Sequence, residues 1–460
     1  MKNIENMLMK IHNNYHPFNF NTRKAFASIG CLILLACTTA LVQAPAAWIN
    51  SIHRQRISIN EDWRFYKYDS IAKADGLIYD LRPEVQDHKD DRPADAKPTE
   101  AEDVEAAQMV LKPWILPTGN DFIKDAAKRY ARPEGNPGGD FPFVQSDFDD
   151  SSWEIVNLPH DWAIKGPFIK GWDTEVGGSM GRLPSPGVAW YRKKLDIQAS
   201  DAGKSIFLDV DGAMSYAMVW LNGKLAGGWP YGYASWRVDL TPYVVPGGEN
   251  QLAIRLDNPP SSSRWYPGGG IYRNVWLTKT NPVHVGQWGT FMTTRDVSEV
   301  SATIHMEVTI NNDSKDDAKV AVVTQIFVLN ADGNKIGDAV AAFEPLKTLV
   351  AAGERAKVEG SVTLKNPRLW GPPPLQVPNR YVAVTTLWQN DKPVDQYETR
   401  FGIRSLRFEP DSGIYVNGEL IKIKGVDQHH DLGALGAAFN TRAAERQLEM
   451  LREMGCNAIR

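Results

Sequence analysis

The sequence predicts a mainly β protein: two β-sandwiches in series, then the first β-α-β elements of an incomplete (β/α)8 barrel. Between Ile57 and Leu277, short runs of alternating apolar and polar residues are separated by turn residues, a pattern typical of half-buried strands. A second region of the same kind extends from Pro282 to Arg404. After Arg404 come a strand, a loop, an amphipathic helix and a second strand, and this order is typical of an α/β fold.

The N-terminal residues have the features of an export signal. Arg23 and Lys24 precede the apolar stretch Ala25–Val42, and Ala44-Pro45-Ala46 supplies a small-x-small cleavage site. We therefore expect residues 1–46 to be a signal peptide and the protein to be exported, either periplasmic or secreted.

Cys37 leaves an alternative open, because the residues around it are also similar to a bacterial lipoprotein signal, which would acylate this cysteine. A membrane anchor is disfavoured, since crossing a bilayer takes ~20 apolar residues and no second such stretch follows. No transmembrane segment is expected in the mature chain.

The first sandwich is expected over residues 52–281. Ser205–Val210 and Gln251–Leu256 read as strands, and Asn222-Gly223 is the dipeptide that best supplies a type I′ hairpin turn. One segment interrupts the pattern: Arg82–Glu105 has nine acidic residues, four basic residues and three prolines. Such a segment cannot bury enough apolar surface to form a core element, so we expect a solvated insertion over roughly 70–140.

The second sandwich is expected over residues 282–404. Ile304–Ile310, Val320–Leu329 and Tyr381–Trp388 read as strands, and Asp332-Gly333 marks a hairpin. A region of this length with this pattern fits an immunoglobulin-like sandwich. Its residues indicate no chemistry, and a spacer role is the simplest interpretation.

Residues 405–460 have a different pattern. A hairpin at Tyr415–Leu420 leads into a strand at Ile421–Val426, and after a loop Thr441–Met454 has helical spacing. Gly455 stands where a helix would end, and Cys456–Ile459 reads as the next strand. We expect this segment to be the opening of an α/β barrel or sheet; a whole barrel takes about 250 residues, so a barrel would be incomplete here.

Composition excludes some classes of function. With 51 basic and 55 acidic residues the formal net charge is −4, so nothing indicates a nucleic-acid partner. Of the three cysteines only Cys456 lies outside the N-terminal stretch, so no internal disulfide is expected. Eleven of the fifteen tryptophans fall between Trp63 and Trp276, which indicates a large aromatic core, a sugar-stacking surface, or both.

Candidate binding residues follow the two strands of the last segment. The first strand runs into Asp427-Gln428-His429-His430-Asp431, and the second ends at Arg460. Working residues of α/β barrels lie at the carboxyl ends of strands, so His429, His430 and Arg460 could hold ligand hydroxyl groups at one rim. The alternative is that this loop is only a turn. Two adjacent histidines point different ways and make a poor metal site, so the residues indicate no cofactor.

Blocks of sequence distributed along the chain resemble family 2 of the glycoside hydrolases. They are Phe148–Trp153, Leu158–Trp162, Trp190–Arg192, Val219–Gly223, Ser263–Val275, Gly425–Asp431, Gly433–Ala438 and Met454–Arg460. The resemblance extends from about Arg56 to Arg460, and many matched blocks in order are more specific than any single motif.

The resemblance implies a jelly-roll-like sugar-binding sandwich, an immunoglobulin-like sandwich and a catalytic barrel in series. It also implies that His429 and Arg460 line the sugar subsite and that Arg264 reaches toward it from a sandwich loop. Asp149, Asp150, His160 and Asp161 are expected to hold turns rather than to touch sugar. A divalent cation is possible in the family, but no residue here supports one.

The resemblance further implies an exo-acting retaining β-glycosidase, with an oligosaccharide or glycan as substrate and β-galactosidase as the favoured activity. β-Glucuronidase and β-mannosidase remain alternatives, as does a non-catalytic carbohydrate-binding protein. A retaining glycosidase needs two carboxylates ~5–5.5 Å apart, and the family places both as glutamates on later barrel strands. We therefore expect no catalytic residue before Arg460 and no activity from these 460 residues alone.

Overall fold

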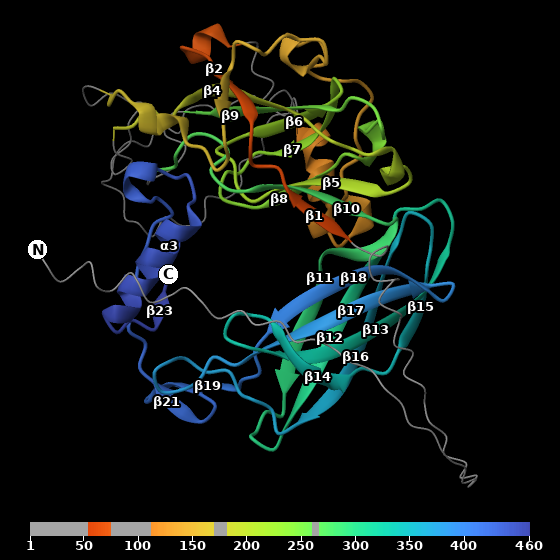
Figure 1. Cartoon of the computed structure of the whole chain (residues 1–460), viewed down its shortest axis with the longest axis vertical. Helices are drawn as coiled ribbons and strands as arrows, with labels where there is room; N and C mark the ends of the chain where they lie inside the picture. Colours follow the sequence, from red (N-terminus) through yellow and green to blue (C-terminus); the bar gives the residue numbers. More distant parts are fainter. Residues whose placement is uncertain (1–53, 75–111, 170–181, 260–265) are drawn as a thin grey trace, which may run out of the picture. The chain divides into compact units, whose positions relative to one another are not determined.

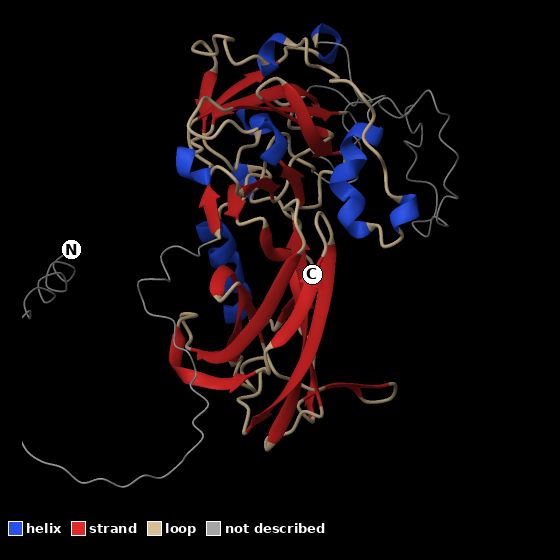
Figure 2. Cartoon of the chain, turned by 90° about the vertical axis from the view of Figure 1, so that its right-hand side faces the viewer, coloured by secondary structure: helices blue, strands red, loops and turns tan. Residues whose placement is uncertain are grey.

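The computed structural model describes residues 54–74, 112–169, 182–259 and 266–460 (Figure 1). The expected signal peptide, most of the charged insertion and Arg264 lie outside these residues. The described part of the chain consists mainly of strands, with short helices between them (Figure 2). This confirms the mainly β fold class.

Two antiparallel sheets form the first sandwich. One has the strand order β3-β2-β4-β9-β6-β7 and the other the order β1-β10-β5-β8. The strands are β1 (Gln55–Ser58), β2 (Trp63–Lys67), β3 (Glu154–Val156), β4 (Gly187–Lys194), β5 (Ser205–Val210), β6 (Ala217–Leu221), β7 (Lys224–Trp229), β8 (Trp236–Asp239), β9 (Gln251–Asn258) and β10 (Val275–Thr280).

The predicted hairpin joins β6 to β7. Asn222 and Gly223 have φ angles of 51° and 74°, which are the positive values that a type I′ turn requires. Apolar side chains from both sheets meet in one core, which includes Trp63, Leu208 and Ile254.

The outer face of the six-stranded sheet carries a second, aromatic core. Trp190 and Trp220 are fully buried there, with ring centroids 5.4 Å apart. Trp114 and Ile115, in the short helix α2 (Lys112–Ile115), are buried against it. Trp114 and Ile115, at the start of the described end of the predicted insertion, therefore cover the sheet, whereas most residues from Lys124 to Gly135 are exposed.

The second sandwich consists of a three-stranded sheet, β11-β12-β16, and a second sheet of order β14-β13-β17-β18 in which β15 also pairs with β13. The burial of β12 alternates along its whole length, as expected for a strand with one face on the core. The strands are β11 (Val283–Arg295), β12 (Ser301–Asn312), β13 (Ala318–Leu329), β14 (Lys335–Ala342), β15 (Leu346–Val350), β16 (Arg355–Lys365), β17 (Arg380–Gln389) and β18 (Lys392–Phe401).

The last segment begins with a small antiparallel sheet of β19 (Leu406–Glu409), β20 (Gly413–Val416) and β21 (Glu419–Ile421). The next two strands, β22 (Gly425–Val426) and β23 (Ala458–Ile459), pair in parallel, and helix α3 (Thr441–Glu453) lies between them in the sequence. Gly455 has a φ angle of 83° just beyond the helix, as predicted. A parallel pair joined by a helix is the repeating unit of an α/β barrel, but the barrel itself stays a prediction.

The prediction of one continuous strand over Ile421–Val426 is wrong for residues 422–424, which are not in a strand. Its two ends belong to different sheets, because the side chain of Asn457 takes the place of a strand at residues 422–424. The Asn457 carboxamide accepts a hydrogen bond from the Lys424 N–H at 2.8 Å and donates one to the Lys422 carbonyl at 3.0 Å. These two backbone groups are therefore hydrogen-bonded although no neighbouring strand pairs with them.

Helix α3 leaves its apolar side chains largely uncovered. It has no buried residue, and Leu448 and Met450 are 51% and 48% exposed. Among the described residues, no helix has the length and apolar character that crossing a membrane requires.

Candidate functional site

The carboxyl ends of β22 and β23 bring the predicted site residue Arg460 close to Asp427. The strand register extends past both ends, since Gln428 N–H donates to the Arg460 carbonyl and Arg460 N–H donates to the Val426 carbonyl, each at 2.9 Å. Arg460 Nη1 then lies 3.0 Å from Asp427 Oδ1. Both side chains are exposed, so this ion pair contributes little to stability and leaves the guanidinium open to a ligand.

His429 and His430 line one hollow of about 190 Å³, together with Tyr272 from the first sandwich and Gln447 and Leu448 of α3. His429 is exposed on the loop. The structure thus brings both histidines to one hollow, while Arg460 lies at the neighbouring strand end and is not among its lining residues.

His430 is tied to the first sandwich. Its ring lies edge-on to Tyr233, with centroids 5.4 Å apart, and 5.5 Å from the ring of Tyr272. Its Nε2 is 3.3 Å from the Pro267 carbonyl oxygen. Burial lowers the pKa of this imidazole, so the neutral form that can donate and accept hydrogen bonds is favoured.

Asp161 joins the sandwich to the loop that contains the histidines. This carboxylate is completely buried. It accepts hydrogen bonds from the backbone N–H groups of Ala163 and Gly269, each at 3.0 Å, and from the Tyr266 hydroxyl at 2.6 Å. A fourth bond comes from the Ala437 N–H at 2.9 Å, which fixes the Gly433–Ala438 run against the sandwich.

Two glycines permit this close approach. Gly436 has a φ angle of 60°, and a side chain there would collide with the Asp161 carboxylate. Gly268 has a φ angle of 74°, and a Cβ atom on it would collide with Ala437. Burial, with the Asp161 charge beside it, also raises the pKa of Tyr266, so its phenol stays protonated and remains a donor.

The other residues expected to hold turns make contacts within the first sandwich region. Asp149 accepts the Ser151 N–H at 2.9 Å, and Asp150 forms an ion pair with buried Arg192 at 2.8 Å. His160 Nδ1 lies 2.9 Å from the Tyr191 hydroxyl. None of these residues lines the hollow.

The carboxylates of α3 are held along the helix surface. Glu445 and Glu449 pair with Arg442, and Glu453 pairs with Arg446. They are thus part of an exposed ion-pair network, as a helix outside a barrel would present.

One set of potential metal ligands occurs among the described residues, on the surface of the second sandwich. It consists of His305, Glu307 and Glu359. The Lys357 ammonium lies 2.6 Å from Glu307 and lowers the pKa of that carboxyl, so a cation already neutralises the group. This set gives no reason to assign a metal.

Comparison with known proteins agrees with this architecture. Residues 283–404 match the sequence model of glycosyl hydrolases family 2, and residues 186–265 match that of the glycosyl hydrolase 2 galactose-binding domain-like family. A β-galactosidase of Bacteroides ovatus is 42% identical over 318 residues, which are 69% of this chain and 36% of that protein. A putative β-glucuronidase of Formosa agariphila is 33% identical over 322 residues, which are 69% of this chain and 29% of that protein.

Solved structures give the same result. A glycosyl hydrolase family 2 member from Bacteroides cellulosilyticus superimposes with a TM-score of 0.64 at 28% identity, covering 88% of this chain and 42% of that one. A β-glycosidase from Bacteroides vulgatus gives 0.63 at 27%, covering 88% and 41%. The chain spans about a third of the length of the curated relatives that it matches. Over that span, the matched family models, relatives and structures identify the chain as a member of glycosyl hydrolase family 2.

Proposed function

We propose that this chain belongs to an exo-acting retaining β-galactosidase, in which it supplies part of the sugar subsite. The observation that carries the proposal is the hollow at the carboxyl end of β22, where His429 and His430 meet Tyr272 of the first sandwich. Imidazole nitrogens offer hydrogen bonds to sugar hydroxyls.

Arg460 and Asp427 extend this surface. Their ion pair places a guanidinium with several donors beside a carboxylate acceptor at the strand ends. Neighbouring hydroxyls of one sugar need such alternating donors and acceptors. We include His429 and Arg460 in the subsite, and we include Arg264, which lies outside the described residues, as an expectation from family resemblance.

The galactoside is favoured over other sugars because the β-galactosidase of Bacteroides ovatus is 42% identical to this chain, against 33% and 30% for a putative β-glucuronidase and a β-glucuronidase of Formosa agariphila. β-Glucuronidase is the second candidate because those relatives also share more than 300 aligned residues with the chain. A glucuronidase would have to balance the substrate carboxylate with a cation.

We further propose that the acid/base and nucleophile glutamates come from the part of the family protein that these 460 residues do not span, and that the 460-residue chain is inactive alone. Retaining hydrolysis needs two carboxylates ~5–5.5 Å apart across the scissile bond. The carboxylates of α3 are engaged with Arg442 and Arg446, and they do not line the hollow. Export through the N-terminal signal is also part of this proposal.

The test is hydrolysis of p-nitrophenyl β-D-galactoside and β-D-glucuronide by the product of the complete gene that contains this chain, and by residues 1–460 alone. We expect the complete product to cleave the galactoside and the 460-residue chain to cleave neither. Cleavage of the glucuronide alone would refute the galactoside assignment. Turnover by the 460-residue chain would refute the proposal that the two catalytic glutamates lie outside these residues.

The role of His429 can be tested in the same assay. In the complete product, His429→Ala should lower kcat/KM for the preferred glycoside about 100-fold or more, since a lost hydrogen bond to a transition-state hydroxyl costs a few kcal/mol. His305→Ala, on the surface of the second sandwich, is the matched control and should leave kcat/KM unchanged. Equal activity of both variants would remove His429 from the site.

A further inference from the structure

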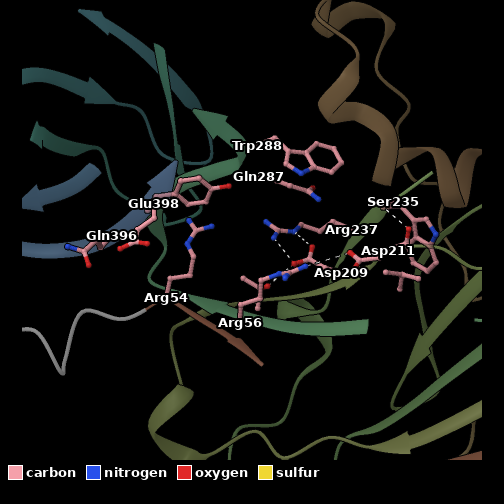
Figure 3. A pocket seen from close by; sticks show the side chains of 14 residues that line it. Arg54, Arg56, Asp209, Asp211, Ser235, Arg237, Gln287, Trp288, Gln396 and Glu398 are labelled. Carbon is pink, nitrogen blue, oxygen red and sulfur yellow. Dashed lines mark hydrogen bonds and ion pairs between the residues drawn. The ribbon is translucent and has the colours of Figure 1, made fainter. Parts of the chain in front are cut away.

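A second pocket lies where the first sandwich meets the immunoglobulin-like one (Figure 3). Its volume is about 420 Å³, within the roughly 300–1,000 Å³ range of small-molecule sites. Strands β5, β8 and β10 supply one wall, and strands β11 and β18 supply the other. It shares no lining residue with the hollow at His429.

The charges of the pocket balance. Its lining includes three arginines and three acidic residues, which are Arg54, Arg56, Arg237, Asp209, Asp211 and Glu398. Arg237 holds Asp209 through two bonds of 2.6 and 2.8 Å, and Arg56 lies 3.6 Å from Asp211. Figure 3 shows Arg237 directed at Asp209 within the pocket. Because each cation faces an anion, the pocket favours a neutral ligand with many hydrogen-bonding groups over a phosphate, sulfate or carboxylate.

These polar groups are fixed before any ligand arrives. The Arg56 guanidinium stacks on Trp276 at 3.9 Å, and the Arg54 guanidinium lies 4.9 Å from the ring centre of Tyr397. Arg54 also lies 2.8 Å from Asp395, which is buried. Groups that are already ordered lose little entropy on binding.

Trp288 projects from a distortion of β11. The register of β11 with β12 shifts between Val285 and Thr290, where the pairing of the two strands is irregular. Within this stretch Trp288 has a φ angle of 49°, a strained value for a bulky residue, and its side chain remains 57% exposed. Trp288 and Gln287, both within this irregular stretch, line the pocket. The exposed indole is a stacking surface for a flat apolar group.

From these observations we propose that the pocket between the two sandwiches is a carbohydrate-binding site for a neutral, disaccharide-sized unit. Trp288 would stack on one sugar ring, and the paired arginines and carboxylates, with Gln287, would form hydrogen bonds with the hydroxyls. This inference rests on the pocket's lining and not on glycosidase activity.

The test is a titration of the 460-residue chain with lactose, followed by isothermal calorimetry and saturation-transfer NMR. We expect Trp288→Ala to raise the Kd about tenfold or more and Gln287→Ala to raise it about threefold, since the first removes a stacking surface and the second a hydrogen bond. Phe291→Ala is the matched control, because Phe291 lies on the same strand and is 59% exposed.

The expected pattern also includes an unchanged Kd in Phe291→Ala and in His429→Ala, and weaker binding of lactobionate, which carries a charge. The proposal is overturned if the parent chain does not bind lactose, if Trp288→Ala and Gln287→Ala bind as the parent does, or if lactobionate binds more tightly than lactose. Loss of lactose binding in His429→Ala alone would also overturn the proposal, because it would mean that lactose binds in the hollow lined by His429 and His430.

Discussion

Asp161 is the residue on which the arrangement of the site most depends. A buried carboxylate is costly unless hydrogen bonds compensate it, and here three backbone N–H groups and one phenol do so. One of the donors, Ala437, lies 276 residues further along the chain. The Asp161 side chain therefore fixes the loop that contains His429, His430 and Ala437 to the first sandwich.

Asp161→Ala should destabilise the protein by about 3 kcal/mol or more, because it leaves several buried donors without an acceptor. The measurement is urea unfolding followed by tryptophan fluorescence. Asp149→Ala is the control, since Asp149 also accepts a backbone N–H but is exposed, and it should cost within about 1 kcal/mol. Similar losses in the two variants would show that burial of Asp161 is not what matters.

The sequence predicts part of this residue-scale picture. The family resemblance led us to expect that Asp161 holds a turn, and the Asp161 side chain caps the short helix that starts at Trp162. The bond to Ala437 could not be predicted, because no local pattern relates residues so far apart. The small residues of the Gly433–Ala438 run can be seen in the sequence. Only the folded structure shows why they are small: this run approaches the Asp161 carboxylate too closely for larger side chains.

At the scale of elements, strands and turns are predictable where one face is buried and the turn chemistry is specific. β12, β13 and β17 and the Asn222-Gly223 hairpin are such cases. The strand over Ile421–Val426 failed because apolar alternation cannot reveal that a side chain, that of Asn457, will satisfy the backbone in place of a neighbouring strand.

Asn457→Ala should therefore loosen the link between β21 and β22. It removes two hydrogen bonds to residues 422–424, and we expect amide exchange of the Lys424 N–H to become at least tenfold faster, which corresponds to about 1.4 kcal/mol. Asn440→Ala, which removes the N-cap of α3, is the control and should speed exchange in the helix but not at Lys424. Unchanged exchange at Lys424 in Asn457→Ala would contradict the role given to this side chain.

Helix α3 and its neighbours should also be the most protease-sensitive described element of the chain. Leu448, Met450 and Met454 are 51%, 48% and 71% exposed, and few buried contacts mean easy local opening. Limited trypsin digestion should cut within residues 405–460 first, with Arg442, Arg446 and Arg452 as accessible sites, while both sandwiches resist. Equal protection of the sandwiches and of this segment would show that its apolar face is covered in solution.

At the scale of the whole molecule, stability should depend on pH through two histidines, the half-buried His160 of the first sandwich region and the buried His284 of the second. Burial lowers the pKa of His160 and of His284 to about 4 each, from an ordinary value of 6.5. Their unfolded forms therefore bind protons at a higher pH than their folded forms. Above pH 6.5 both states are neutral and the histidines have no effect, and as the pH falls from 6.5 toward 4 unfolding becomes more favourable.

Each histidine should contribute up to about 1.4 kcal/mol of lost stability per pH unit in this window. Urea unfolding at pH 7, 6 and 5 should show a decline below pH 6.5. In His284→Asn the carboxamide can still donate to the Asn281 carbonyl, as His284 Nδ1 does at 3.0 Å, but it cannot titrate. The difference in unfolding free energy between His284→Asn and the parent should therefore narrow or reverse as the pH falls from 7 to 5. A difference that stays constant over this range would mean that His284 is protonated equally in the folded and unfolded chains.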